Sequence, residues 1–391
     1  MAGVRHGKRL QRAITVQREQ VARDRLHADI MALPEGEPRR EAWLAVDSLS
    51  SAWVPSFPTV RDELSAEEFP EVVTTYLGRE SRVVRPYVGQ VINGSSSVVC
   101  DAHGLALGRA ILPGGFLTVH DGCTSTLFRA CVAAGMTVDV EPRHLFQSLI
   151  PPAVLLAPGN APGAIPDARI NVSLPRVATA RHAREGPPQP RRDLLFDGKT
   201  IFGGGGATSR YRKTARARED QSGAVAQRAS EVWADYKGAA RALDQRFTPG
   251  TTPILDRLLS FTPVRALVFG QYAEASADVH ALLRVAAEGM AQREWKRLGA
   301  RSYAEARAFY ISSLRRQMGI AVAREMARHR LRRVPMIGVP REVLLRRRAL
   351  GQVGNGGLQL GPADAPTTFD FLVHQAWVVG GALGGAAAGA A

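Results

Sequence analysis

Two stretches of the sequence decide the fold prediction, IPDARINVSL at residues 165–174 and DLLFDGKTIF at residues 193–202. The first alternates apolar and polar side chains, which is the period of a half-buried β-strand, and the second is a strand candidate with apolar Leu195, Ile201 and Phe202. Asp197 and Lys199 are two positions apart, so on a strand their side chains point to the same face of the sheet. If the two strands pair, Asp167 can join them. The sequence therefore predicts two carboxylates and an ammonium group at one place in a sheet.

These three groups are the ones that metal-assisted hydrolysis of a phosphodiester needs. Carboxylate oxygens hold Mg²⁺, the metal polarises the phosphate and activates a water, and a lysine stabilises the developing charge. The structural alternative is an ordinary turn at Pro166 and Asp167, with Asp197 and Lys199 paired on an exposed strand. The location of both motifs on predicted strands favours the catalytic interpretation.

The flanking sequence predicts the rest of an α/β layer. The further expected elements are a helix that begins at Asp121 as N-cap and stops at Gly135, a strand at residues 136–140, a helix over residues 222–247, a strand at residues 264–272, and a helix over residues 277–295. The strand at residues 264–272 is apolar at its centre, which is typical of a strand buried on both faces. This order predicts a four-stranded mixed sheet flanked by helices.

Six short motifs follow one another between residues 87 and 295. They are VCDAHGLALG at residues 99–108, GG at 114–115, VHDG at 119–122, VEP at 140–142, PD at 166–167 and DGK at 197–199. This order resembles the PD-(D/E)XK, or restriction-endonuclease-like, nuclease core, and more narrowly the endonuclease region at the C-terminal end of some non-LTR retrotransposon polyproteins. The resemblance implies a restriction-endonuclease-like core, Mg²⁺ or Mn²⁺ as cofactor and DNA as partner. It also implies that Asp167, Asp197 and Lys199 are catalytic, the two aspartates as metal ligands.

The chain departs from the family pattern in the cysteine and histidine knuckle that precedes the nuclease core. Residues 88–91 stand where the first cysteine pair is expected, and Val119 replaces the arginine before His120. Cys100 and His103 lack partners for a four-ligand zinc site, so we expect no zinc. The alternative function is accordingly a catalytically inactive relic that binds nucleic acid without cutting it.

Other residues are weaker candidates for the site and for DNA contacts. Glu141 follows the first strand and is either a third acidic metal ligand or an exposed strand end. Basic residues after Phe202, and an Arg-rich segment at residues 315–348, are expected to bind phosphates unless they are solvated surface. The predicted nucleic-acid contacts are His120, Arg210, Arg212, Lys213, Arg332 and Arg333.

The composition of the 391-residue chain limits the class of protein. With 45% hydrophobic and 22% charged residues it is neither disordered nor fibrous. Its 51 Lys plus Arg outnumber 36 Asp plus Glu, for a net charge of +15. Because nearly all of these cations are arginine, coding bias explains the basicity as well as nucleic-acid binding does. A structural α/β protein without a nucleic-acid partner is therefore a third interpretation.

The sequence predicts four regions. They are a basic helix and irregular region at residues 1–86, the nuclease-like core at 87–300, an Arg-rich helical segment at 301–350, and a Gly/Ala-rich, low-order tail at 351–391. Ser65 and Glu68 are spaced as a capping box that opens a short helix. Three unpaired cysteines and the lack of an apolar leader predict an intracellular protein with no membrane partner. A DNA substrate would imply nuclear residence.

Overall fold

The computed structural model describes residues 2–55, 63–92, 98–110, 112, 115–152, 165–172, 193–203, 211, 223–261, 263–340 and 342–343. Its core is a mixed sheet with the strand order β1-β2-β3-β4. The strands are β1 (Thr137–Val140), β2 (Ala168–Asn171), β3 (Asp193–Ile201) and β4 (Arg265–Gly270). β1 and β3 each pair antiparallel with β2, and β3 pairs parallel with β4. The predicted four-stranded mixed sheet is therefore confirmed.

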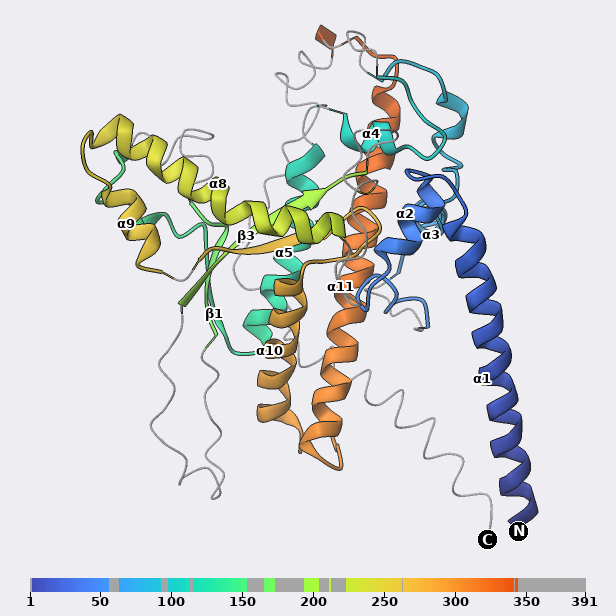
Figure 1. Cartoon of the computed structure of the whole chain (residues 1–391). Coiled ribbons are helices and arrows are strands. Elements are labelled where there is room, and N and C mark those ends of the chain that lie inside the picture. The colour runs from blue at the N-terminus through green and yellow to red at the C-terminus, as the bar shows by residue number, and fades with distance from the viewer. Residues whose placement is uncertain are drawn as a thin grey trace.

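Helices cover both faces of this sheet (Figure 1). They are α5 (Gly115–Ala133), α8 (Gly223–Phe247), α9 (Pro253–Leu259), α10 (Ala277–Glu294) and α11 (Tyr303–Arg333). Leu194 and Phe196 of β3 enter the core formed with α5, α10 and α11, whereas Leu195 and Ile201 enter the core formed with α8 and α9. β3 thus contributes side chains to two hydrophobic cores, because successive residues of a strand point to opposite faces.

Two predicted elements match the structure closely. All residues of β4 except Arg265 are buried, as expected for a strand covered on both faces. The face of α8 that carries Val225, Val232 and Tyr236 is buried against the sheet, as its helical spacing predicts.

The start of α5 differs from the prediction. The helix begins at Gly115, so Asp121 lies inside it and is not its N-cap. The reason is an apolar stripe that starts a turn earlier than expected, because the buried residues Val119, Cys123 and Leu127 recur every four positions. Gly135 ends the helix region as predicted, with a left-handed φ of 82°.

The Arg-rich helix α11 belongs to the main core. Its buried residues recur every four positions, from Tyr310 through Leu314 and Met318 to Met326. The predicted Arg-rich helical segment that starts at residue 301 thus contains α11, and this helix packs on α5 and α10. The tail at residues 351–391 lies outside the described residues.

The N-terminal region adds three helices to one side of the body. They are α1 (Ala2–Met31), α2 (Pro38–Ala45) and α3 (Glu68–Tyr76). The capping box is confirmed, because the Ser65 backbone N–H donates to Glu68 Oε2 (3.0 Å) and the Glu68 backbone N–H donates to Ser65 Oγ (3.1 Å). Four short helical elements lie elsewhere along the chain: η1 (Arg85–Tyr87), α4 (Leu105–Arg109), η2 (Arg143–Leu145) and η4 (Val334–Met336). Among the described residues, no helix is both long enough and apolar enough to span a bilayer.

Candidate active site

Strand register aligns three acidic residues across the sheet. Val140 pairs with Ala168, and Ala168 pairs with Phe196. One position further along these antiparallel ladders, Glu141, Asp167 and Asp197 are neighbours, and the Glu141 backbone N–H donates to the Asp167 carbonyl (2.8 Å). The three carboxyl-bearing residues that the sequence singled out are therefore adjacent: Glu141 directly follows β1, Asp167 directly precedes β2, and Asp197 lies on β3.

Asp197 forms the buried end of the site. It is 2% exposed, and its Oδ1 accepts a hydrogen bond from the Tyr236 hydroxyl of α8 (2.7 Å). Its Oδ2 is 2.6 Å from Lys199 Nζ, so the predicted sharing of one strand face is confirmed. Burial, followed by the charge of Asp167, raises the pKa of Asp197, and the contacts with Lys199 and Tyr236 only partly oppose this.

Asp167 is held from the α5 side. Its Oδ2 accepts the backbone N–H of Gly198 (2.5 Å) and lies 2.8 Å from His120 Nε2. Burial alone would raise the pKa of Asp167, but the hydrogen bond and charge of His120, the Gly198 N–H and the charge of Lys199 together lower it. Asp167 is therefore an ionised carboxylate at neutral pH.

His120 lies between two carboxylates. Its Nδ1 is 3.1 Å from Asp121 Oδ1, while its Nε2 faces Asp167. Burial opposes the charged imidazolium, yet these two acidic partners raise the pKa of His120 to about 10. The imidazolium thus donates from both ring nitrogens and neutralises part of the negative charge at the site.

Gly198 allows these elements to approach one another. A Cβ at this position would lie 2.5 Å from Thr124 Cγ2 and 2.7 Å from His120 Nε2. Any side chain would therefore displace α5 or break the contact between His120 and Asp167. This explains why the middle position of the DGK motif is glycine in this chain.

Access to solvent is uneven across the site. The side chains of Lys199 and Asp167 are 34% and 26% exposed, whereas Asp197 is almost fully buried. A ligand can therefore reach the ammonium group and one carboxylate from solvent, with the second carboxylate behind them.

Glu141 joins the acidic row through its backbone only. Its φ is 46°, which turns the chain at the end of β1, and its exposed side chain pairs with Arg143 (2.6 Å). Within the described residues, no group of three His, Cys, Asp or Glu side chains is arranged to hold a metal ion. The structure thus brings together Asp167, Asp197 and Lys199, but not the side chain of Glu141.

The predicted nucleic-acid contacts have different outcomes. Arg210, Arg212 and Lys213 lie outside the described residues. His120 faces Asp167, and Arg332 is paired with Glu325 (3.2 Å).

The structure contradicts the predicted nucleic-acid contact of Arg333, because this residue is buried. It is 1% exposed and donates to the carbonyl oxygens of Leu107, Gly108 and Ala110 at 2.8–2.9 Å. Its guanidinium stabilises the loop around α4 and cannot reach a phosphate, because Arg333 lies seven residues, about two helical turns, after Met326 and so on the buried side of α11.

Sequence reasoning missed the roles of His120 and Tyr236. Tyr236 was predicted as part of the apolar face of α8, and a buried tyrosine hydroxyl requires a hydrogen-bond partner, which was a usable signal. No comparable signal exists for His120, because its partner Asp167 is 47 residues away along the chain.

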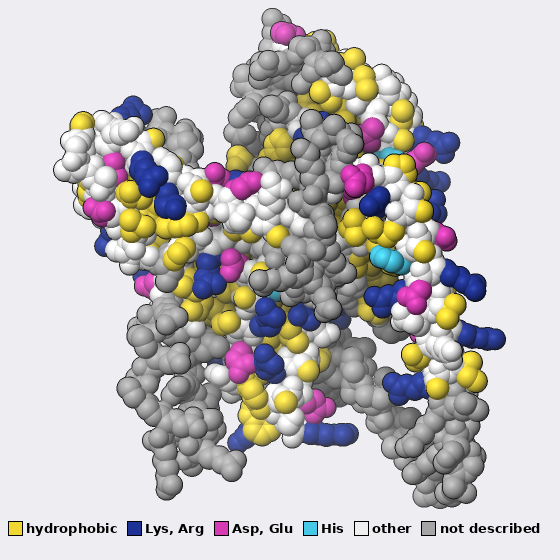
Figure 2. Space-filling view, in the orientation of Figure 1, with side chains coloured by type: hydrophobic (Ala, Val, Ile, Leu, Met, Phe, Trp, Pro, Cys, Tyr) yellow, Lys and Arg dark blue, Asp and Glu magenta, His cyan; other side chains and the backbone are white. Residues whose placement is uncertain are grey.

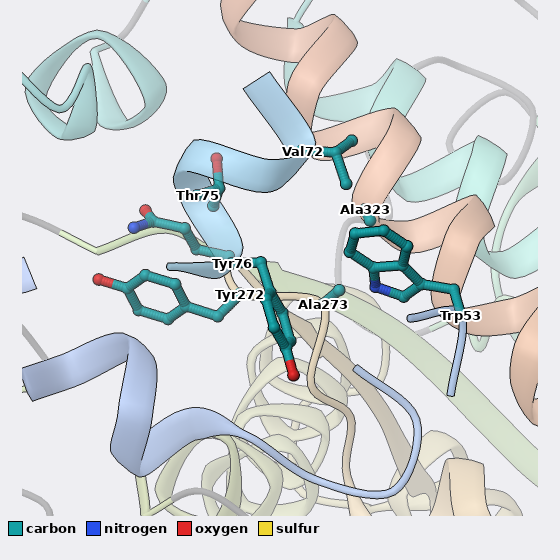
Figure 3. A pocket seen from close by; sticks show the side chains of 8 residues that line it. Trp53, Val72, Thr75, Tyr76, Tyr272, Ala273 and Ala323 are labelled. Atoms are coloured by element: carbon teal, nitrogen blue, oxygen red, sulfur yellow. The ribbon is translucent and has the colours of Figure 1, made fainter. Parts of the chain in front are cut away.

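Two cavities lie elsewhere on the described surface. One, of about 10 Å³, lies between Trp53, Tyr76 and Tyr272 (Figure 3) and has room for one water at most. The other is an open groove of about 310 Å³ on β1, β2 and β3. It is lined by Thr137, Asp139, Arg169, Asn171 and Asp193. The groove lies on the same three strands that carry the acidic row.

Comparison of the chain with protein-family models, with curated proteins and with solved structures finds no match. The structure itself shows a mixed α/β fold with a four-stranded mixed sheet between helices. Membership of the restriction-endonuclease-like nucleases stays a prediction, carried by the motifs at Asp167, Asp197 and Lys199.

Proposed function

We propose that this protein is a metal-dependent endonuclease that hydrolyses phosphodiester bonds in DNA, with Asp167, Asp197 and Lys199 as its catalytic residues. The observation that carries the proposal is their electrostatic coupling. Asp167, just before β2, and Asp197 of β3 lie one position beyond the paired residues Ala168 and Phe196. The charge of Asp167 raises the pKa of Asp197, the charge of Lys199 lowers the pKa of both aspartates, and Lys199 contacts Asp197. Perturbed carboxylates at a partly open site are typical of catalytic centres.

The two aspartates fit a divalent cation. Burial, followed by the charge of Asp167, raises the pKa of Asp197, and Lys199 and Tyr236 do not fully compensate for this. A bound cation would favour the ionised carboxylate. Mg²⁺ is commonly bound by one or two carboxylates together with waters and substrate phosphate, so Asp167 and Asp197 suffice as protein ligands. When bound, such an ion polarises a phosphate and activates water. Glu141 would become a third metal ligand only if its ion pair with Arg143 were broken.

The remaining residues have supporting roles in this proposal. The ammonium group of Lys199 is partly exposed, so it can stabilise the negative charge that develops on a scissile phosphate. Tyr236 and His120 are positioning residues, because each holds one carboxylate through a hydrogen bond of 2.7–2.8 Å. Gly198 lets both sides of the site close around β3.

A second function, nucleic-acid binding without cleavage, is favoured by one feature of the same site. Asp197 is ion-paired with Lys199, and Asp167 is already bonded to His120 and to the Gly198 N–H. Both carboxylates therefore have partners within the chain. A relic of this kind would bind DNA in a salt-sensitive manner, independent of chelator and of Asp197.

The test is cleavage of supercoiled and branched DNA in Mg²⁺ or Mn²⁺ by the parent protein, Asp197→Ala and Lys199→Ala. We expect each variant to lose about 100-fold or more of the rate, since each removes a group that acts on the reacting phosphate. Asp193→Ala is the matched control, because Asp193 is a half-exposed carboxylate on the same strand, paired with Arg169. The proposal fails if the parent cuts none of these substrates, or if Lys199→Ala cuts as well as the parent.

A binding measurement separates the two functions. Undiminished DNA binding by the parent and by Asp197→Ala, without cleavage by either, would establish the binding relic in place of the nuclease.

A further inference from the structure

Helix α1 stands away from the rest of the molecule (Figure 1). All residues from 11 to 29 are exposed, and Ile30 follows them as a buried residue. Contact with the body is made near its C-terminal end, where Trp43 Nε1 of α2 donates to His27 Nδ1 (3.0 Å). Helices in proteins owe most of their stability to tertiary packing. A long helix with an exposed circumference is therefore a candidate for a surface that a partner covers.

The charge of α1 indicates the chemistry of that partner. The helix contains seven Lys or Arg against three Asp or Glu, and residues 2–18 contain five Lys or Arg and no acid. Figure 2 shows basic side chains along its exposed length. Arg12, Arg18, Arg23 and Arg25 are all exposed, and none forms an ion pair with a carboxylate of the described residues.

Several arginines of α11 are different, because acidic residues neutralise them. Arg328 Nε is 2.5 Å from Glu68, Arg332 pairs with Glu325, and Arg330 is buried beside Glu71. Helix α11 was the basic segment from which DNA contacts were expected. Its paired cations have little attraction left for phosphates, whereas those of α1 retain theirs.

The apolar side chains of α1 argue against a membrane as its partner. Ile14 and Val21 are seven residues apart and share one face, but Val16 lies roughly 200° around the helix from Ile14. Leu26 lies on a third side of the helix, roughly 120° around it from Ile14. A helix that inserts into a bilayer surface has its apolar residues on one side. In α1 they are distributed around the helix, as they are on a solvent-exposed polar helix.

We propose that α1 is a nucleic-acid-binding arm, which contacts the phosphate backbone of duplex DNA through Arg12, Arg18, Arg23 and Arg25. At 30 residues the helix is about 45 Å long, which is roughly the length of 13 base pairs of B-DNA. Contacts of this kind supply affinity without reading the base sequence. The inference rests on the proposed function for its choice of DNA as substrate, and it adds the surface that holds that substrate.

The test measures binding of the full chain to a labelled 30-base-pair duplex in EDTA, over a range of salt concentrations. The variant combines Arg12→Gln, Arg18→Gln, Arg23→Gln and Arg25→Gln, since glutamine has a helix propensity close to that of arginine. We expect binding to weaken roughly tenfold or more, and the slope of log affinity against log salt to fall by about 3 to 4, because each phosphate contact contributes about 0.9. The combined Arg→Lys variant should keep most of the affinity.

The matched control removes the same number of charges elsewhere. It combines substitutions by glutamine of arginines that are paired with carboxylates. These are Arg228, Arg265, Arg307 and Arg328. The control should bind DNA nearly as the parent does.

Three outcomes overturn the inference. They are an unchanged affinity and salt slope in the α1 variant, an equal loss in the control, and a parent chain that binds vesicles with 30% anionic phospholipid but not the duplex. Because the assay contains a chelator and scores binding alone, failure of the nuclease proposal leaves its result interpretable.

Discussion

Helices α1 and α11 are nearly equal in length, with 30 and 31 residues, and both are rich in arginine. They have opposite environments. Helix α11 buries an apolar face in the main core and pairs its arginines with carboxylates and carbonyls, whereas α1 exposes residues 11 to 29. The difference teaches that a count of arginines does not indicate what the arginines do. Their function depends on whether the fold supplies acidic partners.

The cause of the difference can be found in the spacing of the apolar residues. In α11 large apolar residues recur every four positions from Tyr310 to Met326, which forms one continuous stripe. In α1 the exposed apolar residues point in several directions, so no face can be buried whole. Helix α3 then supplies Glu68 and Glu71 to the arginines of α11.

The largest expected effect tests whether Arg333 is structural. Arg333→Met should lower the free energy of unfolding by roughly 3–5 kcal/mol, because three backbone carbonyls of the α4 region lose their donor in the interior. Arg332→Met, on the next residue of the same helix, should cost less than about 1 kcal/mol because its ion pair is half exposed. Urea denaturation measures both. Equal effects would remove the distinction between buried and exposed arginines.

A smaller effect should show how closely α11 is packed. A Cβ on Gly319 would lie 2.3 Å from the Leu49 carbonyl oxygen, so Gly319→Ala should cost roughly 1–3 kcal/mol of unfolding free energy. Gly238 of α8 meets nothing within 4 Å, and Gly238→Ala should instead stabilise the protein by about 0.5–1 kcal/mol. Thermal and urea unfolding of both variants provide the measurement. A neutral Gly319→Ala would mean that α11 is loosely packed.

The third prediction concerns the pH dependence of stability that His120 causes, on the face of α5 that points to the sheet. The pKa of His120 is raised to about 10 in the fold. A raised pKa means that its stabilising contribution is complete below the unfolded value near 6.5 and is lost as pH rises through about 10. The lowered pKa of Asp167 sets the acid limit, because its contribution is lost as pH falls through the folded value.

His120→Gln should therefore cost roughly 1–2 kcal/mol at pH 5.5, which lies between the values for an exposed pair and a buried charge-assisted bond. The difference from the parent should shrink at pH 9.5 and above. His144→Gln is the control, since His144 is half exposed and 3.6 Å from Asp139. A difference that is independent of pH would contradict the ionic contact between His120 and Asp167.

The smallest expected effect is on α1. The combined Arg12, Arg18, Arg23 and Arg25 to glutamine variant should change the free energy of unfolding by less than about 0.5 kcal/mol in total, because these exposed side chains contact no described partner and small changes of either sign offset one another. Urea denaturation of the same protein preparation that is used for DNA binding measures it. A loss as large as that of Arg333→Met would show that α1 is part of the core after all.

The secondary structure was largely predictable, and the exceptions have physical causes. Strands at 137–140, 193–201 and 265–270 lie within the predicted stretches, because alternation and apolar runs are local properties of the sequence. The start of α5 was missed because Asp121 has the composition of an N-cap, yet its side chain pairs with His120. The burial of α11 was missed because its many arginines concealed an apolar stripe.

Some features of the candidate site were likewise predictable from the sequence, and others were not. The common face of Asp197 and Lys199 follows from the two-residue period of a strand, and the structure confirms it. The approach of Asp167 required the pairing of β2 with β3, which the motifs suggested but a single strand cannot specify. The contacts of His120 and Tyr236 required two helices to pack on opposite faces of β3.

The sequence by itself determined the strands, the shared face of Asp197 and Lys199, the capping box at Ser65 and the basic character of both long helices. These properties depend on residues within a few positions of one another, so local periodicity is sufficient to predict them. Only the tertiary structure decided which arginines are buried, which carboxylates they meet, and that Gly198 brings His120 onto Asp167. Those outcomes depend on segments that are tens to hundreds of residues apart, and burial and charge pairing between such segments arise only when the chain has folded.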